Sequence, residues 1–248
     1  MGAPLRPMRF AILDIETRID KRLLREVLYR GQEMDEEQAY LRMNEELGGG
    51  FAPTSLHVPI SIAVGNVSEE YVLESVTNLA AERESEDQLV REFWRRAEQF
   101  TGCLVTFNGR GFDLPVLELH ALRRGIRAPV HFAHRSRWPD DRHLDLQDFL
   151  TNRGDFRIRG GLDLLLKSIG LPGKTQIDGS KVQELYEGGH FAEIDRYCRS
   201  DVIQTYFLFL RVQLLRGKID HAAYSRAREA SSRYLAEIGA PADAGRLP

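Results

Sequence analysis

Five runs of the chain carry the apolar patterns that predict β-strands, and all lie within the first 150 residues. These runs are residues 8–16, 59–67, 71–78, 103–109 and 143–146. The first is almost continuously apolar until Asp14 and Glu16 close it, which is typical of a buried strand. The second and third flank Ser68-Glu69-Glu70 and predict a hairpin. Together the runs predict a mixed sheet of five or six strands.

Helical patterns occupy most of the remaining chain. We expect helices over residues 21–46, 85–100, 112–125, 160–169, 179–189, 191–216 and 221–238. Ser85 is a typical N-cap, because acids follow it in the first turn, and Gly125 is a typical C-terminal residue. Residues 126–142 have the composition of a loop.

The order of these elements predicts an α/β fold, in which helices flank both faces of a central mixed sheet. We expect a single domain over residues 1–238, with a helical insertion at residues 20–57 that ends at the glycines 48–50 and the residues after them. Residues 239–248 are expected to be a disordered tail. In sheets of this class, function gathers at strand ends and in the loops that follow them.

Composition narrows the class of protein. A chain of 248 residues with 42% hydrophobic and 29% charged side chains is typical of a globular protein with a sizeable core. The formal net charge of -3 excludes a strongly basic chain. It does not exclude a nucleic-acid partner, because bound metal ions offset carboxylates where phosphates dock.

The cysteines and the hydropathy of the chain indicate the cellular compartment in which we expect the protein. Cys103 and Cys198 lie in apolar surroundings without C-x-x-C spacing, so we expect buried free thiols in place of a disulfide or a zinc site. No apolar run reaches the roughly 20 residues of a membrane span, and the first residues lack the apolar core of a secretory signal. We therefore expect a cytoplasmic protein.

The acids at the end of the first strand are the first candidate site. A spacing of two on an extended chain places the side chains of Asp14 and Glu16 on one face. An unpaired carboxylate at the end of a buried strand is costly to desolvate, and two of them repel unless a cation bridges them. A divalent metal is one natural partner. Contacts with an arginine or with a helix N-terminus also explain the pair.

Two further segments carry acids in comparable positions. In "TFNGRGFDLP" an apolar strand is followed by a turn and then by Asp113, in the first turn of a helix whose dipole stabilises a carboxylate. In "DRYCRSDVIQTY" Tyr197 and Asp201 lie four apart on a helix, so their side chains are neighbours at the edge of its apolar stripe. Each segment alone is also explained by ordinary helix capping or by a hydrogen bond within the helix.

In combination, and in this order, the segments resemble a known family. "LDIET", "TFNGRGFDLPVL" and "YCRSDVIQTYFLFLR" are similar to the three exonuclease motifs of the DEDD superfamily of 3'-5' exonucleases. The similarity is closest to the proofreading exonuclease domain of family B DNA polymerases and to its stand-alone relatives, which "LPGKTQIDGSKV" also resembles. The resemblance extends from about Arg9 to Arg211 and implies a ribonuclease H-like fold.

One position indicates the branch of this superfamily. The DEDDh branch has a histidine five residues before the last acid, where this chain has Arg196. The DEDDy branch has a tyrosine four residues before it, where this chain has Tyr197. The chain therefore resembles the DEDDy branch.

The resemblance implies a mechanism with two Mg²⁺ or Mn²⁺ ions, which clamp the attacking and leaving oxygens of a phosphodiester. Asp14 would contact both ions, Glu16 and Asp201 would complete the site that activates water, and Asp113 would reach the other ion. Tyr197, a phenol with an unperturbed pKa of about 10, is better suited to orienting the attacking water than to removing its proton.

The resemblance also implies contacts with the terminal nucleotide. The backbone near Thr17, together with Asn108 and Phe112, would meet it, with the Phe112 ring as a wedge or a stacking partner. A phenylalanine at this position is equally typical of a core. Two roles stay open for Asp145: it is an acid that supports the metal ligands, or it is a cap at the end of its strand.

The resemblance implies a metal-dependent 3'-5' exonuclease that hydrolyses phosphodiester bonds, with single-stranded DNA as the expected substrate, and we expect no membrane partner. An RNA-specific exonuclease stays an alternative, because nothing in the motifs reads the 2'-hydroxyl. A non-catalytic nucleic-acid-binding module and a scaffold protein that binds partners through residues 20–57 are two further hypotheses. No polymerase domain fits within 248 residues.

Overall fold

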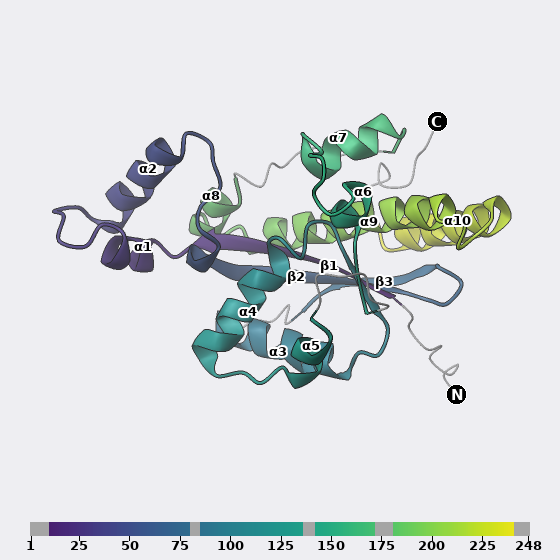
Figure 1. The fold of residues 1–248 in the computed structure, drawn as a ribbon, viewed down its shortest axis with the longest axis horizontal. Coiled ribbons are helices and arrows are strands. Elements are labelled where there is room, and N and C mark those ends of the chain that lie inside the picture. Colours follow the sequence, from purple (N-terminus) through teal and green to yellow (C-terminus); the bar gives the residue numbers. More distant parts are fainter. Residues whose placement is uncertain (1–9, 80–84, 136–141, 172–180, 241–248) are drawn as a thin grey trace.

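The computed structural model describes residues 10–79, 85–135, 142–171 and 181–240 (Figure 1). The expected tail from residue 241 onward and most of the segment "LPGKTQIDGSKV" lie outside these ranges. The strands are β1 (Phe10–Ile19), β2 (His57–Val67), β3 (Leu73–Asn78), β4 (Cys103–Thr106) and β5 (His143–Asp145).

The strands form one mixed sheet of five strands, in the order β3-β2-β1-β4-β5. β1 pairs antiparallel with β2 and parallel with β4, and β4 pairs parallel with β5. β2 and β3 form the expected hairpin. The prediction of a mixed sheet with five or six strands is therefore confirmed, with five in the described part of the chain.

Helices flank this sheet on both faces. They are α1 (Lys21–Val27), α2 (Glu36–Leu47), the short 3-10 helix η1 (Thr54–Leu56), α3 (Glu86–Gln99), α4 (Asp113–Arg124), α5 (Pro129–His134), α6 (Leu146–Leu150), α7 (Gly161–Ser168), α8 (Val182–Glu187), α9 (Phe191–Leu215) and α10 (His221–Glu237). Figure 1 shows the long α9 along one face of the sheet and α3 and α4 on the other. Among the described residues, no helix is both long enough and apolar enough to cross a membrane.

Alternation along β1 divides the core between these two faces. Phe10 and Ile12 pack in a cluster with residues of α9, such as Val202. Leu13 and Ile15 pack in a second cluster with residues of α3 and α4. Because side chains alternate along a strand, the acids that follow Ile12 at every second position face α9 and not α3.

The helical segment between β1 and β2 differs from its prediction. Residues 21–46 form two helices in place of one, because Gly31 adopts a positive φ of 80° and Asp35 starts a new helix with a capping box to Gln38. The two helices project beyond the end of β1 (Figure 1).

The expected loop over residues 126–142 is also partly wrong. Residues Pro129–His134 form α5, with proline at the first helical position, where its missing N–H costs nothing. The polar composition of this segment concealed the short helix.

Candidate active site

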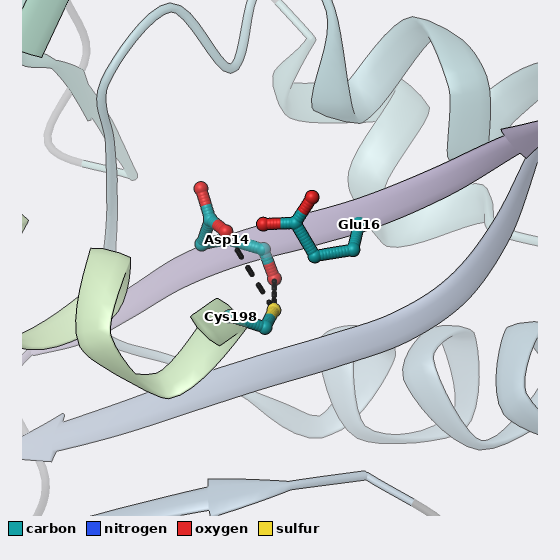
Figure 2. Close-up of side chains that lie close together, drawn as sticks. All are labelled: Asp14, Glu16 and Cys198. Carbon is teal, nitrogen blue, oxygen red and sulfur yellow. Dashed lines mark hydrogen bonds between the residues drawn. The ribbon is translucent and has the colours of Figure 1, made fainter. Parts of the chain in front are cut away.

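Asp14 and Glu16 project side by side from β1 toward α9, where they meet Cys198 (Figure 2). One ligand atom from each of the three residues lies within 4.8 Å of the others. The Cys198 thiol donates a hydrogen bond to the Asp14 carbonyl oxygen (3.3 Å), and its sulfur lies 3.6 Å from Asp14 Oδ2. Burial, followed by the charges of Asp14 and Glu16, raises the pKa of the Cys198 thiol well above its ordinary value.

The two cysteines follow their prediction in part. Both are free thiols, and Cys198 is buried as expected. Cys103 is only half-buried, because it lies at the start of β4, where the sheet ends. The contact between Cys198 and the acids of β1 was not predicted. The available signal was the position of Cys198 between Tyr197 and Asp201 on α9, within the same motif.

Asp113 is buried at the first turn of α4, with 6% of its surface exposed. Burial raises the pKa of this carboxyl to about 7, and the charges of Asp145 and Asp201 add to the effect. Hydrogen bonds from its own backbone N–H and from that of Ile15 act in the opposite direction. The expectation that Asp14 and Glu16 close the first strand is wrong, because β1 continues to Ile19. Since Ile15 lies between these acids, Asp113 lies next to the acidic segment of β1.

Tyr197 and Asp201 are one turn apart on α9, and both are buried. The charge of Asp201 raises the pKa of Asp113 as well as that of Cys198. Asp201 is therefore close to both the α4 side and the β1 side of the site. Of the four predicted acids, the structure places Asp14 and Glu16 within ligand distance of each other, in a group with Cys198 that includes neither of the other two. Asp113 on α4 and Asp201 on α9 are close enough for the charge of Asp201 to act on Asp113, and Asp14 and Asp201 are 187 positions apart in the sequence.

A β-bulge positions the surroundings of Tyr197. The β1–β2 register shifts between Glu16 and Thr17, so that Ser61 and Pro59 are paired while Ile60 is skipped. Ser61 faces α9, where its hydroxyl donates to Asp195 (2.7 Å). Ile60 also turns toward α9, where it packs in one cluster with Tyr197. Regular alternation would have pointed Ile60 to the opposite face, so the bulge provides the apolar support of Tyr197.

Asp145 acts as a cap at the end of its strand. It accepts hydrogen bonds from Gln147 and Asp148 at the start of α6, and from the backbone N–H groups of Asn108 (3.0 Å) and Arg110 (2.9 Å). The last two bonds hold the turn that leads into Asp113. The expected cap at the end of the strand is thus present, and the same side chain fixes the turn before Asp113 and acts on Asp113 through its charge.

The three residues expected near a terminal nucleotide lie in different surroundings. Asn108 is exposed and has a positive φ of 65°. Thr17 Oγ1 is hydrogen-bonded to His57 Nδ1 (2.8 Å). Phe112 is half-buried and packs edge-on against the rings of His57 and Phe51. Neither Phe51 nor His57 was predicted from the sequence, because nothing in their local pattern marks them.

The donor set fits divalent cations that prefer oxygen ligands. Asp14, Glu16, Asp113 and Asp201 supply carboxylate oxygens, which Mg²⁺ and Mn²⁺ prefer. Three of these four acids are buried, and burial is the main cause of the raised pKa of Asp113, to which repulsion from Asp145 and Asp201 adds. A cation among them would remove this repulsion, since it compensates the charge that burial leaves unscreened.

The chain was compared with curated proteins and with solved structures. The search of curated proteins gave no significant match. Among solved structures, the chain is similar to one titled "ExoI/SSB-Ct complex", with 15% identity and a TM-score of 0.35 over 85% of this chain and 46% of that one. The chain thus spans about half the length of that protein.

A family model described as "Predicted 3'-5' exonuclease related to the exonuclease domain of PolB" matches residues 49–243. The sheet of five mixed strands with helices on both faces is the α/β arrangement consistent with a ribonuclease H-like exonuclease. The match covers most of the sequence, including the segments that carry Asp113, Tyr197 and Asp201. The chain therefore belongs to the family of predicted 3'-5' exonucleases related to the exonuclease domain of PolB.

Proposed function

We propose that this protein is a metal-dependent 3'-5' exonuclease of the DEDDy type, which hydrolyses phosphodiester bonds from the 3' end of single-stranded DNA. The observation that carries the proposal is the proximity of Asp113 on α4 to Asp201 and to the segment of β1 that carries Asp14 and Glu16. The pKa of Asp113 is raised to about 7, first by burial and then by the charges of Asp145 and Asp201. Membership of the exonuclease family supports a nucleic acid as the substrate.

In this proposal four acids would hold two divalent ions, Mg²⁺ or Mn²⁺. Asp14 would contribute to both, Glu16 and Asp201 would complete one site, and Asp113 would belong to the other. When bound, such a pair of ions stabilises charge on the attacking and leaving oxygens of an in-line displacement. The protein's own contribution is to fix the carboxylates on three packed elements, β1, α4 and α9, so that little reorganisation accompanies the reaction.

Tyr197 is assigned to orienting the attacking water through its hydroxyl group. Its ring packs in a cluster with Ile60, Val182 and Ile194, and this packing restricts the direction in which the hydroxyl points. One turn further along α9, Asp201 faces the same region. A fixed donor next to a metal-binding acid suits the alignment of a water molecule.

The contacts with the terminal nucleotide are assigned to three residues near these acids. Thr17 directly follows Glu16 on β1, so its backbone is adjacent to the acids. The exposed Asn108 and the ring of Phe112 come from the turn before Asp113. We place the activity in the cytoplasm.

The first test uses a 5'-labelled single-stranded DNA oligomer with purified protein in Mg²⁺, in Mn²⁺ or in EDTA. A ladder that shortens from the 3' end only with metal supports the proposal. Asp201→Asn should abolish the ladder, because a metal ligand is lost. The matched control is Asp163→Asn, which removes a surface acid of α7 that pairs with Lys167 and should leave the ladder unchanged.

A matched RNA oligomer and a blunt DNA duplex complete the design. Faster degradation of RNA than of DNA would move the assignment to an RNA-specific exonuclease. No degradation of any substrate, with Mn²⁺ binding absent in calorimetry, would leave a nucleic-acid-binding module without catalysis as the better function.

A further inference from the structure

A sulfur atom completes a group of three metal-binding donors at β1. The Cys198 sulfur lies 3.6 Å from Asp14 Oδ2, and one ligand atom from each of Asp14, Glu16 and Cys198 lies within 4.8 Å of the other two (Figure 2). In a tetrahedral site with metal–oxygen bonds of about 2.0 Å and a metal–sulfur bond of about 2.3 Å, an oxygen and a sulfur ligand are about 3.5 Å apart. The distance between Asp14 and Cys198 therefore already suits a shared cation.

The sulfur is held in this position from three elements. Cys198 is completely buried on α9, and its thiol donates to the Asp14 carbonyl oxygen on β1 (3.3 Å). On β2, Ser61 is paired with Glu16, and its hydroxyl also contacts the Cys198 sulfur. The same hydroxyl donates to Asp195 (2.7 Å), which fixes β2 against α9. The three donors are thus supported by neighbouring groups, as metal ligands in proteins usually are.

The packing of an apolar core explains only part of this arrangement. Cys198 also belongs to the apolar cluster that includes Ile12 and Val202, so its burial alone needs no ligand. Its sulfur, however, faces two carboxylates, which are costly to bury unless hydrogen bonds or a cation compensate their charge. Asp14 is the most exposed of the three residues, so an ion can reach the group from the side of Asp14.

The sulfur changes which cations this group prefers. Carboxylate oxygens suit Mg²⁺ and Mn²⁺, whereas a thiolate is a soft ligand that favours Zn²⁺ and, by the same argument, Cd²⁺. Two carboxylates and one thiolate supply three protein ligands, which leaves the fourth position of a tetrahedral ion open to water. Such a site differs from the cysteine-rich structural zinc sites that C-x-x-C spacing marks, so the spacing of the cysteines gives no sign of it.

We propose that Asp14, Glu16 and Cys198 bind a thiophilic divalent cation, Zn²⁺ or Cd²⁺, which competes with the ions that support hydrolysis. This inference rests on the proposed function, because the competition concerns two acids that are assigned there to catalytic ions. A divalent cation deprotonates a thiol that it coordinates. On binding, the S–H bond of Cys198 breaks, its proton passes to the buffer, and the sulfur electron pair forms the bond to the cation.

Binding of Cd²⁺ alone tests the site without any substrate. A cadmium–thiolate bond has an ultraviolet charge-transfer band that cadmium–carboxylate bonds lack. Titration of the metal-free wild-type protein with Cd²⁺ should produce this band. Cys198→Ser should lack the band and bind Cd²⁺ more than about 100-fold more weakly, since loss of even an outer partner of a metal ligand costs about 10–100-fold. Serine keeps a hydroxyl that can donate to the Asp14 carbonyl oxygen.

The matched control is Cys103→Ser, which removes the other free cysteine, at the start of β4. This variant should keep the band and the affinity for Cd²⁺. Asp14→Asn keeps both cysteines but should weaken Cd²⁺ binding, which distinguishes the site from a thiol that binds cadmium alone. Cys198→Ala, which removes the sulfur without adding a hydroxyl, should behave like Cys198→Ser. Melting curves check that each variant is folded.

Competition is measured in the exonuclease assay, with each variant compared with its own rate in Mg²⁺ alone. Added Zn²⁺ should inhibit the wild-type protein and Cys103→Ser, and additional Mn²⁺ should relieve the inhibition. Cys198→Ser should need more than about 100-fold more Zn²⁺ for the same fractional inhibition, in line with its weaker binding. Equal sensitivity of Cys198→Ser and the wild type to Zn²⁺ would overturn the competition.

The outcomes separate the two proposals. If the wild-type protein degrades single strands, but the cadmium band persists in Cys198→Ser or disappears in Cys103→Ser, the thiophilic site is wrong and the nuclease assignment stands. If the wild type binds Cd²⁺ through Cys198 but degrades no oligomer, the metal site stands and the nuclease assignment fails. If the wild type binds neither Cd²⁺ nor Mn²⁺ and degrades nothing, both proposals fail together.

Discussion

Asp113 should destabilise the folded protein when no metal is bound. Its pKa rises from an ordinary 3.8 to about 7 because of burial and the charges of Asp145 and Asp201. Between pH 3.8 and about pH 7, Asp113 keeps its proton in the folded protein and has lost it in the unfolded chain. The free energy of unfolding therefore falls as the pH rises through this range. At about 1.4 kcal/mol per pKa unit, the full penalty above pH 7 is about 4 kcal/mol, of which about 3 kcal/mol develops between pH 5 and pH 8.

Asp113→Asn removes this ionisation while keeping the shape of the side chain and an oxygen that accepts hydrogen bonds. In EDTA at pH 8 the variant should therefore be more stable than the wild type, by about 2 kcal/mol once the cost of a buried amide is included. Urea denaturation at pH 5, 6, 7 and 8 measures this, and the variant should lose less stability over the range. Added Mg²⁺ should stabilise the wild type more than the variant, because one ligand is missing.

The control for this experiment is Asp163→Asn, which also alters an acid in the first turn of a helix, here the exposed start of α7. Loss of its contact with Lys167 should slightly lower stability and leave the pH profile unchanged. The reasoning is refuted if Asp113→Asn is less stable than the wild type at pH 8 and shows the same pH profile.

Three further outcomes are expected. Trp94→Ala should lower the free energy of unfolding by about 3–5 kcal/mol in urea denaturation, because the ring is 1% exposed and its N–H donates to the Leu117 carbonyl (3.2 Å); a loss below 1 kcal/mol would contradict the packing of α3 on α4. Gly109→Ala should reduce both stability and nuclease rate, since its Cβ would lie 2.5 Å from Thr106 Cβ and displace the turn that leads to the α4 acid; an unchanged melting curve and rate would contradict this. Tyr197→Phe should lower kcat without changing the melting temperature, and an unchanged kcat would refute the orienting role.

The acids of the candidate site were predictable because each interrupts a clear hydrophobic pattern. Asp14 interrupts an apolar strand, Asp113 opens a helix after a strand, and Asp201 lies on an apolar helical stripe. Each segment alone also fitted ordinary capping, and only the resemblance of the three segments, in this order, to the exonuclease motifs implied that the acids share one site. The mixed sheet was predictable because its strands have strong local patterns.

The features that the sequence did not predict depend on contacts between distant segments, and such contacts leave no signal in the local sequence. Phe51 follows a polar helix and three glycines, and only its contacts with the rings of His57 and Phe112 distinguish it from other exposed residues. Cys198 reads as an ordinary core thiol until α9 is placed against β1. The short α5 carries too few residues for periodicity to be seen, so its composition favoured a loop.

The register between β1 and β2 is the feature that joins these parts into one site. Before the bulge, alternation directs Asp14 and Glu16 to α9, and after it Thr17 is hydrogen-bonded to His57. The skipped Ile60 turns toward Tyr197 and supports it. A slip of one residue would reverse every side chain on β2, which would place Ile62 toward α9 and remove this support. Removing the bulge should therefore impair the tyrosine and the nucleotide contacts together, while leaving the acids of β1 in place.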